Sequence, residues 1–144
     1  MMKLRLASLL VSLLLSGVAQ AQENPANYPS RPIRIVVGNA AGGGTDTIAR
    51  LIGPKLSEKL GQPVVVENKT GAAGAIGAEL AKNAAPDGYT LMFTNSTTMV
   101  QNKVLFKKLP YDPDKDFALV AWFNTGHLPT AVNKDIPVRN MTEF

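Results

Sequence analysis

The sequence predicts an α/β fold built on a parallel sheet, and three observations support this. Short apolar runs rich in β-branched residues recur along the chain, each run ends at a loop of small or polar residues, and a helical pattern follows each loop. Consecutive strand–helix units imply parallel strands joined by right-handed crossovers. Because ligands of such sheets bind beyond the carboxyl ends of the strands, these loops mark the expected site.

The strands are predicted from the apolar runs. The first covers Ile33–Val37, and its almost continuous apolar character suits a strand that is covered on both faces. Residues 64–66 and 90–94 form the next two strands. Residues 117–123 and 128–132 are interpreted as two more. Trp122 and Phe123 are therefore expected in the core, with the floor of a cleft as the alternative.

The first helix is predicted over residues 46–60 from one apolar stripe. The stripe consists of Ile48, Leu51, Ile52, Leu56 and Leu60. Thr45 or Asp46 is expected to cap the start of this helix, and Gly61 is expected to close its end. Pro54 removes a backbone hydrogen bond at a cost of about 3 kcal/mol, so a bend or break is expected there.

Two further helices are predicted, one from the glycine-rich segment 71–77 to about residue 83 and one from the polar loop 95–98 to about residue 106. Residues 109–116 hold two prolines and four charged residues, which indicates a segment that crosses to another part of the fold. Residues 137–144 are interpreted as a turn and the start of an unfinished helix, so the chain is expected to be truncated.

Residues 1–21 have the pattern of a secretory signal peptide. A basic head precedes an apolar run from Leu6 to Leu15 and the small-residue cleavage pattern Ala19-Gln20-Ala21. The run is too short to span a membrane, although an uncleaved anchor is the alternative. We therefore expect a periplasmic protein, secreted through the inner membrane, with no stable membrane insertion after signal cleavage.

Composition excludes several classes of protein. The chain has no cysteine, which excludes disulfides, a thiolate nucleophile and cysteine-based metal sites. Of its 15 basic residues, Lys3 and Arg5 lie in the predicted leader, and the rest nearly balance the 11 acidic residues. With no basic stripe, nucleic acid is not an expected partner.

The loop after the first strand is predicted to bind an anion. Backbone N–H groups at a helix start are unpaired, and the helix dipole favours negative charge there. The candidate ligand-binding residues are Gly42, Gly43, Gly44, Thr45 and Asp46. Asp46 has two interpretations, either a first-turn acid that suits the helix dipole or a group that orients water or a ligand ammonium.

Two nucleotide-binding patterns fail at this loop. A phosphate loop needs lysine immediately before Thr45, where this chain has Gly44. A dinucleotide fingerprint needs a third small residue at position 47, which is threonine. No nucleotide or other cofactor is therefore expected.

The loops after the second and third strands supply the other candidates. Asn68, Gly71 and Ala72 combine a side-chain amide with N–H groups at a helix start, whereas Gly74 and Gly77 are expected to serve close helix–sheet packing. After the third strand the chain offers neutral donors on Asn95, Ser96, Thr97 and Thr98, although capping alone would explain one or two of them. The candidate ligand-binding residues among them are Asn95, Ser96 and Thr97.

No catalytic or metal-binding arrangement is recognisable. His127 is the only histidine, and neither a Ser-x-x-Lys nor a Gly-x-Ser-x-Gly motif frames a nucleophile. Asp112, Asp114 and Asp116 alternate but lack the glycine and the distal glutamate of a calcium loop. The sequence thus favours binding without chemistry and no metal.

Several segments in order resemble one family, the Bug-type receptors, which are the extracytoplasmic solute-binding proteins of tripartite tricarboxylate transporters. The segments that carry the resemblance are residues 28–37, 41–46, 61–68, 71–77, 86–91 and 109–117, among them Ala41-Gly-Gly-Gly-Thr-Asp46, Pro86-Asp-Gly-Tyr-Thr-Leu91 and Leu109-Pro-Tyr-Asp-Pro-Asp-Lys-Asp-Phe117. Each motif alone is weak, but the ordered set spans residues 28 to 144. One departure is Gly38-Asn39, where the family often has a Pro-Phe-like pair.

The resemblance implies a periplasmic-binding-protein-like fold of type II with two lobes that close on a small carboxylate. It implies that residues 43–46 match the family's first carboxylate loop and residues 95–97 its polar segment after the third strand. It also implies three parts, a signal peptide over 1–21, a first lobe over 22–108, and a crossover with an incomplete second lobe over 109–144. Family members are about twice as long, so weak or absent ligand binding is expected of this chain alone.

Taken together, the sequence predicts an exported solute-binding receptor that captures a small organic carboxylate for the subunits of a membrane transporter. Two alternatives remain. One is an exported α/β hydrolase or transferase whose catalytic half is missing, and the other is a non-functional fragment.

Overall fold

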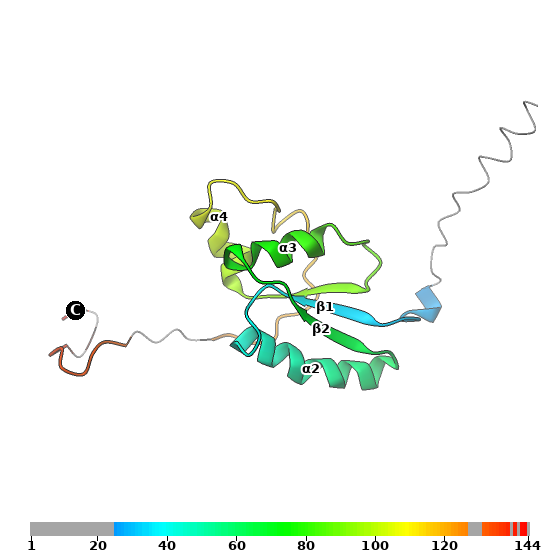
Figure 1. Cartoon of the computed structure of the whole chain (residues 1–144), viewed down its shortest axis with the longest axis horizontal. Coiled ribbons are helices and arrows are strands. Elements are labelled where there is room, and N and C mark those ends of the chain that lie inside the picture. The colour runs from blue at the N-terminus through cyan, green and yellow to red at the C-terminus, as the bar shows by residue number, and fades with distance from the viewer. Residues whose placement is uncertain (1–24, 127–130, 139, 141, 144) are drawn as a thin grey trace, which may run out of the picture.

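The computed structural model describes residues 25–126, 131–138, 140 and 142–143. Within them a three-stranded parallel sheet lies between helices (Figure 1). The strand order is β2-β1-β3, and the strands are β1 (Ile33–Val37), β2 (Val64–Asn68) and β3 (Thr90–Phe93). Both pairings are parallel, which confirms the α/β prediction. The predicted signal peptide and His127 lie outside the described residues.

Helices cover both faces of this sheet. Helix α2 lies on one face and α3 on the other, with α4 beyond α3 (Figure 1). The helical elements in chain order are η1 (Pro25–Asn27), α2 (Gly44–Leu60), η2 (Ala72–Gly74), α3 (Ala75–Lys82), the π-helix η3 (Thr97–Gln101) and α4 (Asn102–Leu105).

The core is centred on β1, as expected for the middle strand. Ile35 and Val37 pack with Ala49 of α2 on one face of the sheet. On the other face Ala75 and Ala78 of α3 pack with Tyr111, which returns from the segment after α4. Because side chains alternate along a strand, both faces of β1 are buried, and its nearly continuous apolar sequence follows from this.

Helix α2 runs through Pro54 as one element, so of the predicted bend or break the break is wrong. Pro54 lies on the exposed side of the helix, where water can bond to the carbonyl that proline leaves without a partner. The end was predicted correctly, because Gly61 has φ 67° and its N–H donates to the Ser57 carbonyl at 3.0 Å. The predicted start of the helix was wrong, because Gly43 is the N-cap and both Thr45 and Asp46 lie within the first turn.

The segment after α4 departs most from the prediction. Residues 117–123 form no strand, and Trp122 is 74% exposed rather than part of the core. Phe123 is 52% exposed and contacts Phe93 at the end of β3, with 5.1 Å between ring centroids. No described neighbour pairs with this segment, and a strand needs such a partner.

Two C-terminal predictions fall partly outside the described residues. Of the predicted strand 128–132, only residues 131 and 132 are described, and they are not in a strand. Likewise, the described residues between 137 and 143 contain turns and no helix.

The register brings the three loops to one edge. Val37 is aligned with Asn68 of β2 and with Phe93 of β3, so all three strands end in the same row. The chain then leaves this carboxyl edge through residues 38–43, 69–71 and 94–96. This confirms that the predicted loops share an edge.

Candidate functional site

The carboxylate of Asp46 organises the loop between β1 and α2. Its Oδ2 accepts hydrogen bonds from the N–H of Gly42 at 2.7 Å and from Nε of Arg50 at 3.0 Å. Its Oδ1 accepts a hydrogen bond from Nδ2 of Asn68 at 2.8 Å. Asp46 is only 2% exposed, so its carboxylate interacts with groups of the protein and not with solvent.

The surroundings of Asp46 stabilise its charged form. The hydrogen bond from Arg50 is the largest cause, followed by those from the Gly42 N–H and the Asn68 amide, and together they lower the pKa of Asp46 from 3.8 to about 2. Asp46 is therefore ionised at neutral pH, and the adjacent guanidinium of Arg50 balances its charge. Of its two predicted interpretations, the structure supports the first-turn acid.

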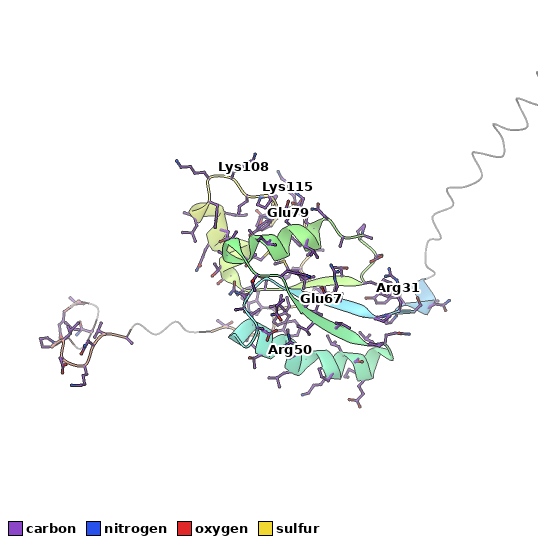
Figure 2. The ribbon with its side chains drawn as sticks, viewed as in Figure 1. Arg31, Arg50, Glu67, Glu79, Lys108 and Lys115 are labelled. Carbon is purple, nitrogen blue, oxygen red and sulfur yellow. The ribbon has the colours of Figure 1, made fainter. Side chains whose placement is uncertain are left out.

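Asn68 connects this loop to the end of β2. Besides Asp46, its Nδ2 donates to the backbone carbonyl of Asn39 at 3.1 Å, and its Oδ1 accepts from Nη2 of Arg50 at 2.8 Å. Figure 2 shows Arg50 on α2 and Glu67 on β2, the two elements that these bonds join. Asn68 is thus a structural link between two of the loops.

Two of the four N–H groups that were predicted to be bare already have partners. The N–H of Gly42 donates to Asp46, and that of Gly43 donates to the Ala40 carbonyl at 3.1 Å. Among the described residues, none accepts a hydrogen bond from the N–H of Gly44 or Thr45. These two groups open the 17-residue helix α2, whose dipole favours an anion at this end.

The loop after β2 is left-handed over four consecutive residues. Gly71, Ala72, Ala73 and Gly74 have φ values of 126°, 46°, 53° and 87°. Gly71 and Ala72 are both exposed at the carboxyl edge of the sheet. The conformation is unusual because two of these residues carry a Cβ atom, which the left-handed region disfavours.

Gly74 and Gly77 serve close packing, as predicted. A Cβ atom on Gly77 would lie 2.9 Å from the Cα of Gly38, and one on Gly74 would lie 2.4 Å from the Thr98 hydroxyl oxygen. The start of α3 therefore approaches the end of β1 at backbone distance, which only glycine permits.

The polar loop after β3 has a mixed role. Oδ1 of Asn95 accepts a hydrogen bond from the Thr98 N–H at 3.4 Å, and the Thr97 hydroxyl donates to Oε1 of Gln101 at 2.9 Å. Ser96 and Asn95 are exposed at the sheet edge. Asn95 thus acts partly as a cap, which was one of the interpretations of this loop.

Sequence reasoning missed three residues that shape these loops. They are Arg50, Asn102 and Tyr111. The spacing of Asp46 and Arg50 by four residues was a usable signal, since such pairs meet on one helix face. For Tyr111 no local signal exists, because its contacts depend on how the chain returns after α4.

Other kinds of site find no support in the described part of the chain. It contains no group of three or more histidine, aspartate or glutamate side chains arranged to hold a metal ion. No helix there has the length and apolar character needed to cross a membrane. Two open depressions of about 490 and 580 Å³ are lined by residues outside the three loops.

The comparison with protein families identifies the family of this chain. A family model described as the tripartite tricarboxylate transporter family receptor, TctC, matches residues 48–144. The chain belongs to this receptor family. The resemblance seen in the sequence is thereby confirmed, and so is the fold of a TctC-type periplasmic binding protein.

Individual TctC relatives are much longer than this chain. A UPF0065 protein of Bordetella bronchiseptica is 41% identical over 137 residues, which are 92% of this chain and 41% of that protein. MatC of Rhodopseudomonas palustris, solved with bound malate, is 47% identical with a TM-score of 0.60 over 62% of this chain and 31% of MatC. An R. palustris protein solved with adipate is 36% identical with a TM-score of 0.59 over 60% of this chain and 29% of its own. The chain thus spans about two fifths of the curated relative.

Proposed function

We propose that this TctC-family chain belongs to a periplasmic receptor that captures a small organic carboxylate and delivers it to the membrane subunits of a tripartite tricarboxylate-type transporter. Family membership supports the receptor role over an exported hydrolase or transferase. Two structural relatives were solved with malate and with adipate, which supports a carboxylate as the ligand. Residues 22–108 would form the first lobe, and residues 109–144 would lead into a second.

The free N–H groups of Gly44 and Thr45 are the observation that carries this proposal. They stand at the start of a long helix, at the carboxyl edge of a parallel sheet, where an anion is stabilised by hydrogen bonds and by the helix dipole. Asp46 does not oppose an anion here, because its charge is balanced by Arg50 and both of its oxygens are hydrogen-bonded.

The other loops would complete this wall of the site. Gly71 and Ala72 follow β2, and the exposed side chains of Asn95 and Ser96 follow β3 on the same edge. Thr97 lies beside them at the start of η3. Gly42, Gly43 and Asn68 contribute indirectly, since their hydrogen bonds fix the loop around Asp46.

The proposal can be tested by titrating the full ¹⁵N-labelled chain with L-malate or adipate and following its amide NMR signals. This method detects weak binding residue by residue. We expect the amides of Gly44 and Thr45 to shift with saturation, and the amides near Gly61 at the far end of α2 to stay unchanged. Shifts that saturate elsewhere in the chain while residues 44 and 45 stay unchanged, or uniform small shifts throughout, would reject the proposal.

Gly44 offers a matched pair of variants for the same titration. A Cβ atom at this position would meet nothing within 4 Å, so both Gly44→Asp and Gly44→Asn fit sterically. The aspartate should weaken malate binding by about tenfold or more through like-charge repulsion, whereas the neutral asparagine should retain most of it. Equal affinities of the two variants would show that no anion binds beside Gly44.

A further inference from the structure

Hydrogen bonds to one backbone carbonyl group hold the left-handed turn Gly71–Gly74 in place. The carbonyl oxygen of Ala73 accepts hydrogen bonds from the Thr98 hydroxyl at 3.2 Å and from Nδ2 of Asn102 at 3.1 Å. Both donors are fully buried, with exposed fractions of 0%. A backbone conformation that disfavours alanine persists only where its surroundings impose it, and these two donors are such surroundings.

Tyr111 closes the network from a distant part of the chain. Its hydroxyl accepts a hydrogen bond from Nδ2 of Asn102 at 3.1 Å and donates one to the backbone carbonyl of Thr98 at 2.6 Å. The side chain is 4% exposed and packs against Ala75 and Ala78. Tyr111 thus joins the segment after α4 to the turn after β2 through two buried side chains.

The π-helix makes this connection possible. In η3 the N–H of Asn102 donates to the Thr97 carbonyl, five residues back, instead of the Thr98 carbonyl four residues back. The Thr98 carbonyl accepts the Tyr111 hydroxyl. Single wide turns of this kind occur frequently at functional sites.

The network is not optimised for stability alone. Oδ1 of Asn102 is buried and has no hydrogen-bond partner among the described residues. A partly satisfied buried polar network is less stabilising than an apolar core of the same shape. The network lies beneath a strained turn at the sheet edge. Its presence there therefore indicates that it holds the backbone of that turn in its conformation.

We propose that Thr98, Asn102 and Tyr111 are positioning residues that hold the Gly71–Gly74 turn in the conformation needed to contact the carboxylate. This rests on the proposed function, in which Gly71 and Ala72 contribute to the site. Because Tyr111 belongs to the segment predicted to cross between lobes, its docking and the shape of the turn are coupled. A ligand that contacts the turn also stabilises the docked position of Tyr111, since such coupling is reciprocal.

The test compares Thr98→Val with Thr98→Ser in the full ¹⁵N-labelled chain. Valine keeps the shape but removes the hydroxyl that donates to Ala73, and serine keeps the hydroxyl. In Thr98→Val we expect hydrogen exchange of the Gly74 N–H, which donates to the Gly71 carbonyl at 3.0 Å, to accelerate about tenfold. L-Malate should then shift the amides of Gly44 and Thr45 but no longer that of Ala72, and Thr98→Ser should restore the response.

Tyr111→Phe is the second variant and tests the hydrogen bonds that Tyr111 makes with Asn102 and Thr98. It removes the hydroxyl and keeps the ring that packs on α3, so it should accelerate exchange at Gly74 without loosening α2. The proposal is overturned if both Thr98→Val and Tyr111→Phe exchange at Gly74 like the unaltered chain, or if Thr98→Ser behaves like Thr98→Val. It is also overturned if both variants lose the dispersed signals of the sheet, because the network would then be a folding element.

The two proposals fail in different ways. If L-malate shifts other amides to saturation but not those of Gly44 and Thr45, the carboxylate-binding function fails, while the exchange rates at Gly74 still test the positioning network. If Gly44 and Thr45 respond but Ala72 does not respond in the unaltered chain, the receptor function stands and the positioning role is rejected.

Discussion

The carboxylate of Asp46 and the side-chain amide of Asn68 are joined by a hydrogen bond of 2.8 Å that links the first turn of α2 to the last residue of β2. Asn68 belongs to the strand end that is aligned with Val37, from which the loop to α2 departs. The bond therefore fixes the two ends of this loop relative to the sheet. Much of the site's geometry depends on the ionised state of one carboxyl group.

The stability of the chain should depend on pH through Asp46. The hydrogen bonds of Arg50, Gly42 and Asn68 lower the pKa of this carboxyl from 3.8 to about 2 in the folded state. A depressed folded-state pKa stabilises the fold above the unfolded-state value, and that stabilisation is lost as the pH falls through the folded-state value. The contribution of Asp46 should be complete above about pH 5 and lost between about pH 4 and pH 2.

Urea unfolding midpoints measured from about pH 6 to pH 2 would check this prediction in the unaltered chain and in Asp46→Asn. Asp112 and Asp116 also have lowered pKa values, the first mainly through the N–H of Asp114 and the second mainly through the N–H of Asp112. Both forms should therefore lose stability in acid. The loss should be smaller in Asp46→Asn, and parallel curves for the two forms would contradict the assignment.

Asn68→Asp should destabilise the chain at neutral pH. The change replaces a donor to Asp46 by a second carboxylate and leaves the Asn39 carbonyl without its side-chain donor. The like charge should raise the pKa of Asp46 and lower the melting temperature by about 5 °C or more. The exposed Asn124→Asp, outside the helices and strands, is the matched control, with little expected change. The deficit of Asn68→Asp should shrink on acidification, and a deficit independent of pH would argue against charge repulsion.

The parts of the fold that could be predicted are those encoded within short stretches of sequence. The run Ile33–Val37 is apolar because β1 is buried on both faces, and Gly61 ends α2 because the turn there needs a positive φ. The common edge of the three loops followed from parallel topology alone. Glycine spacing likewise predicted close helix–sheet packing at Gly77, where an added Cβ atom would lie 2.9 Å from the Cα of Gly38.

The contacts and conformations that could not be predicted depend on residues that are distant in the sequence. The pairing of Asp46 with Asn68 requires the strand register, and the return of Tyr111 to Thr98 requires the path of the chain after α4. The positive φ of Ala72 was hidden because alanine gives no signal for that conformation. Residues 117–123 have a strand-like pattern, but a pattern supplies no neighbouring strand to pair with.

Gly53→Ala should stabilise the chain. A Cβ atom on Gly53 would lie 3.7 Å from a Val66 methyl group, which is ordinary van der Waals contact, and the position is inside α2. Replacing glycine by alanine within a helix contributes about 0.5–1 kcal/mol, and the added methyl group buries apolar surface against β2. The urea midpoint should rise accordingly.

Gly77→Ala is the contrasting variant for the same measurement. Its Cβ would lie 2.9 Å from the Cα of Gly38 and 3.0 Å from the Lys69 carbonyl, neither of which can move without shifting backbone. Overpacking of this kind costs about 1–3 kcal/mol, so the helix propensity of alanine should be outweighed. A stabilising effect of Gly77→Ala would show that α3 does not approach the end of β1 as closely as described.

Pro54→Ala should also stabilise the chain, because α2 is continuous through this position. The substitution supplies an N–H that can donate to the Arg50 carbonyl in the regular helical pattern. Proline inside a helix costs about 3 kcal/mol relative to alanine, and its restriction of the unfolded chain returns about 0.4–1 kcal/mol, so a net gain of about 2 kcal/mol is expected. Urea unfolding of Pro54→Ala beside Pro86→Ala, which lies in an exposed turn, separates the helical effect from the unfolded-state effect. If the urea midpoint rose no more in Pro54→Ala than in Pro86→Ala, the helix would be interrupted at Pro54 in solution, as its sequence alone predicts.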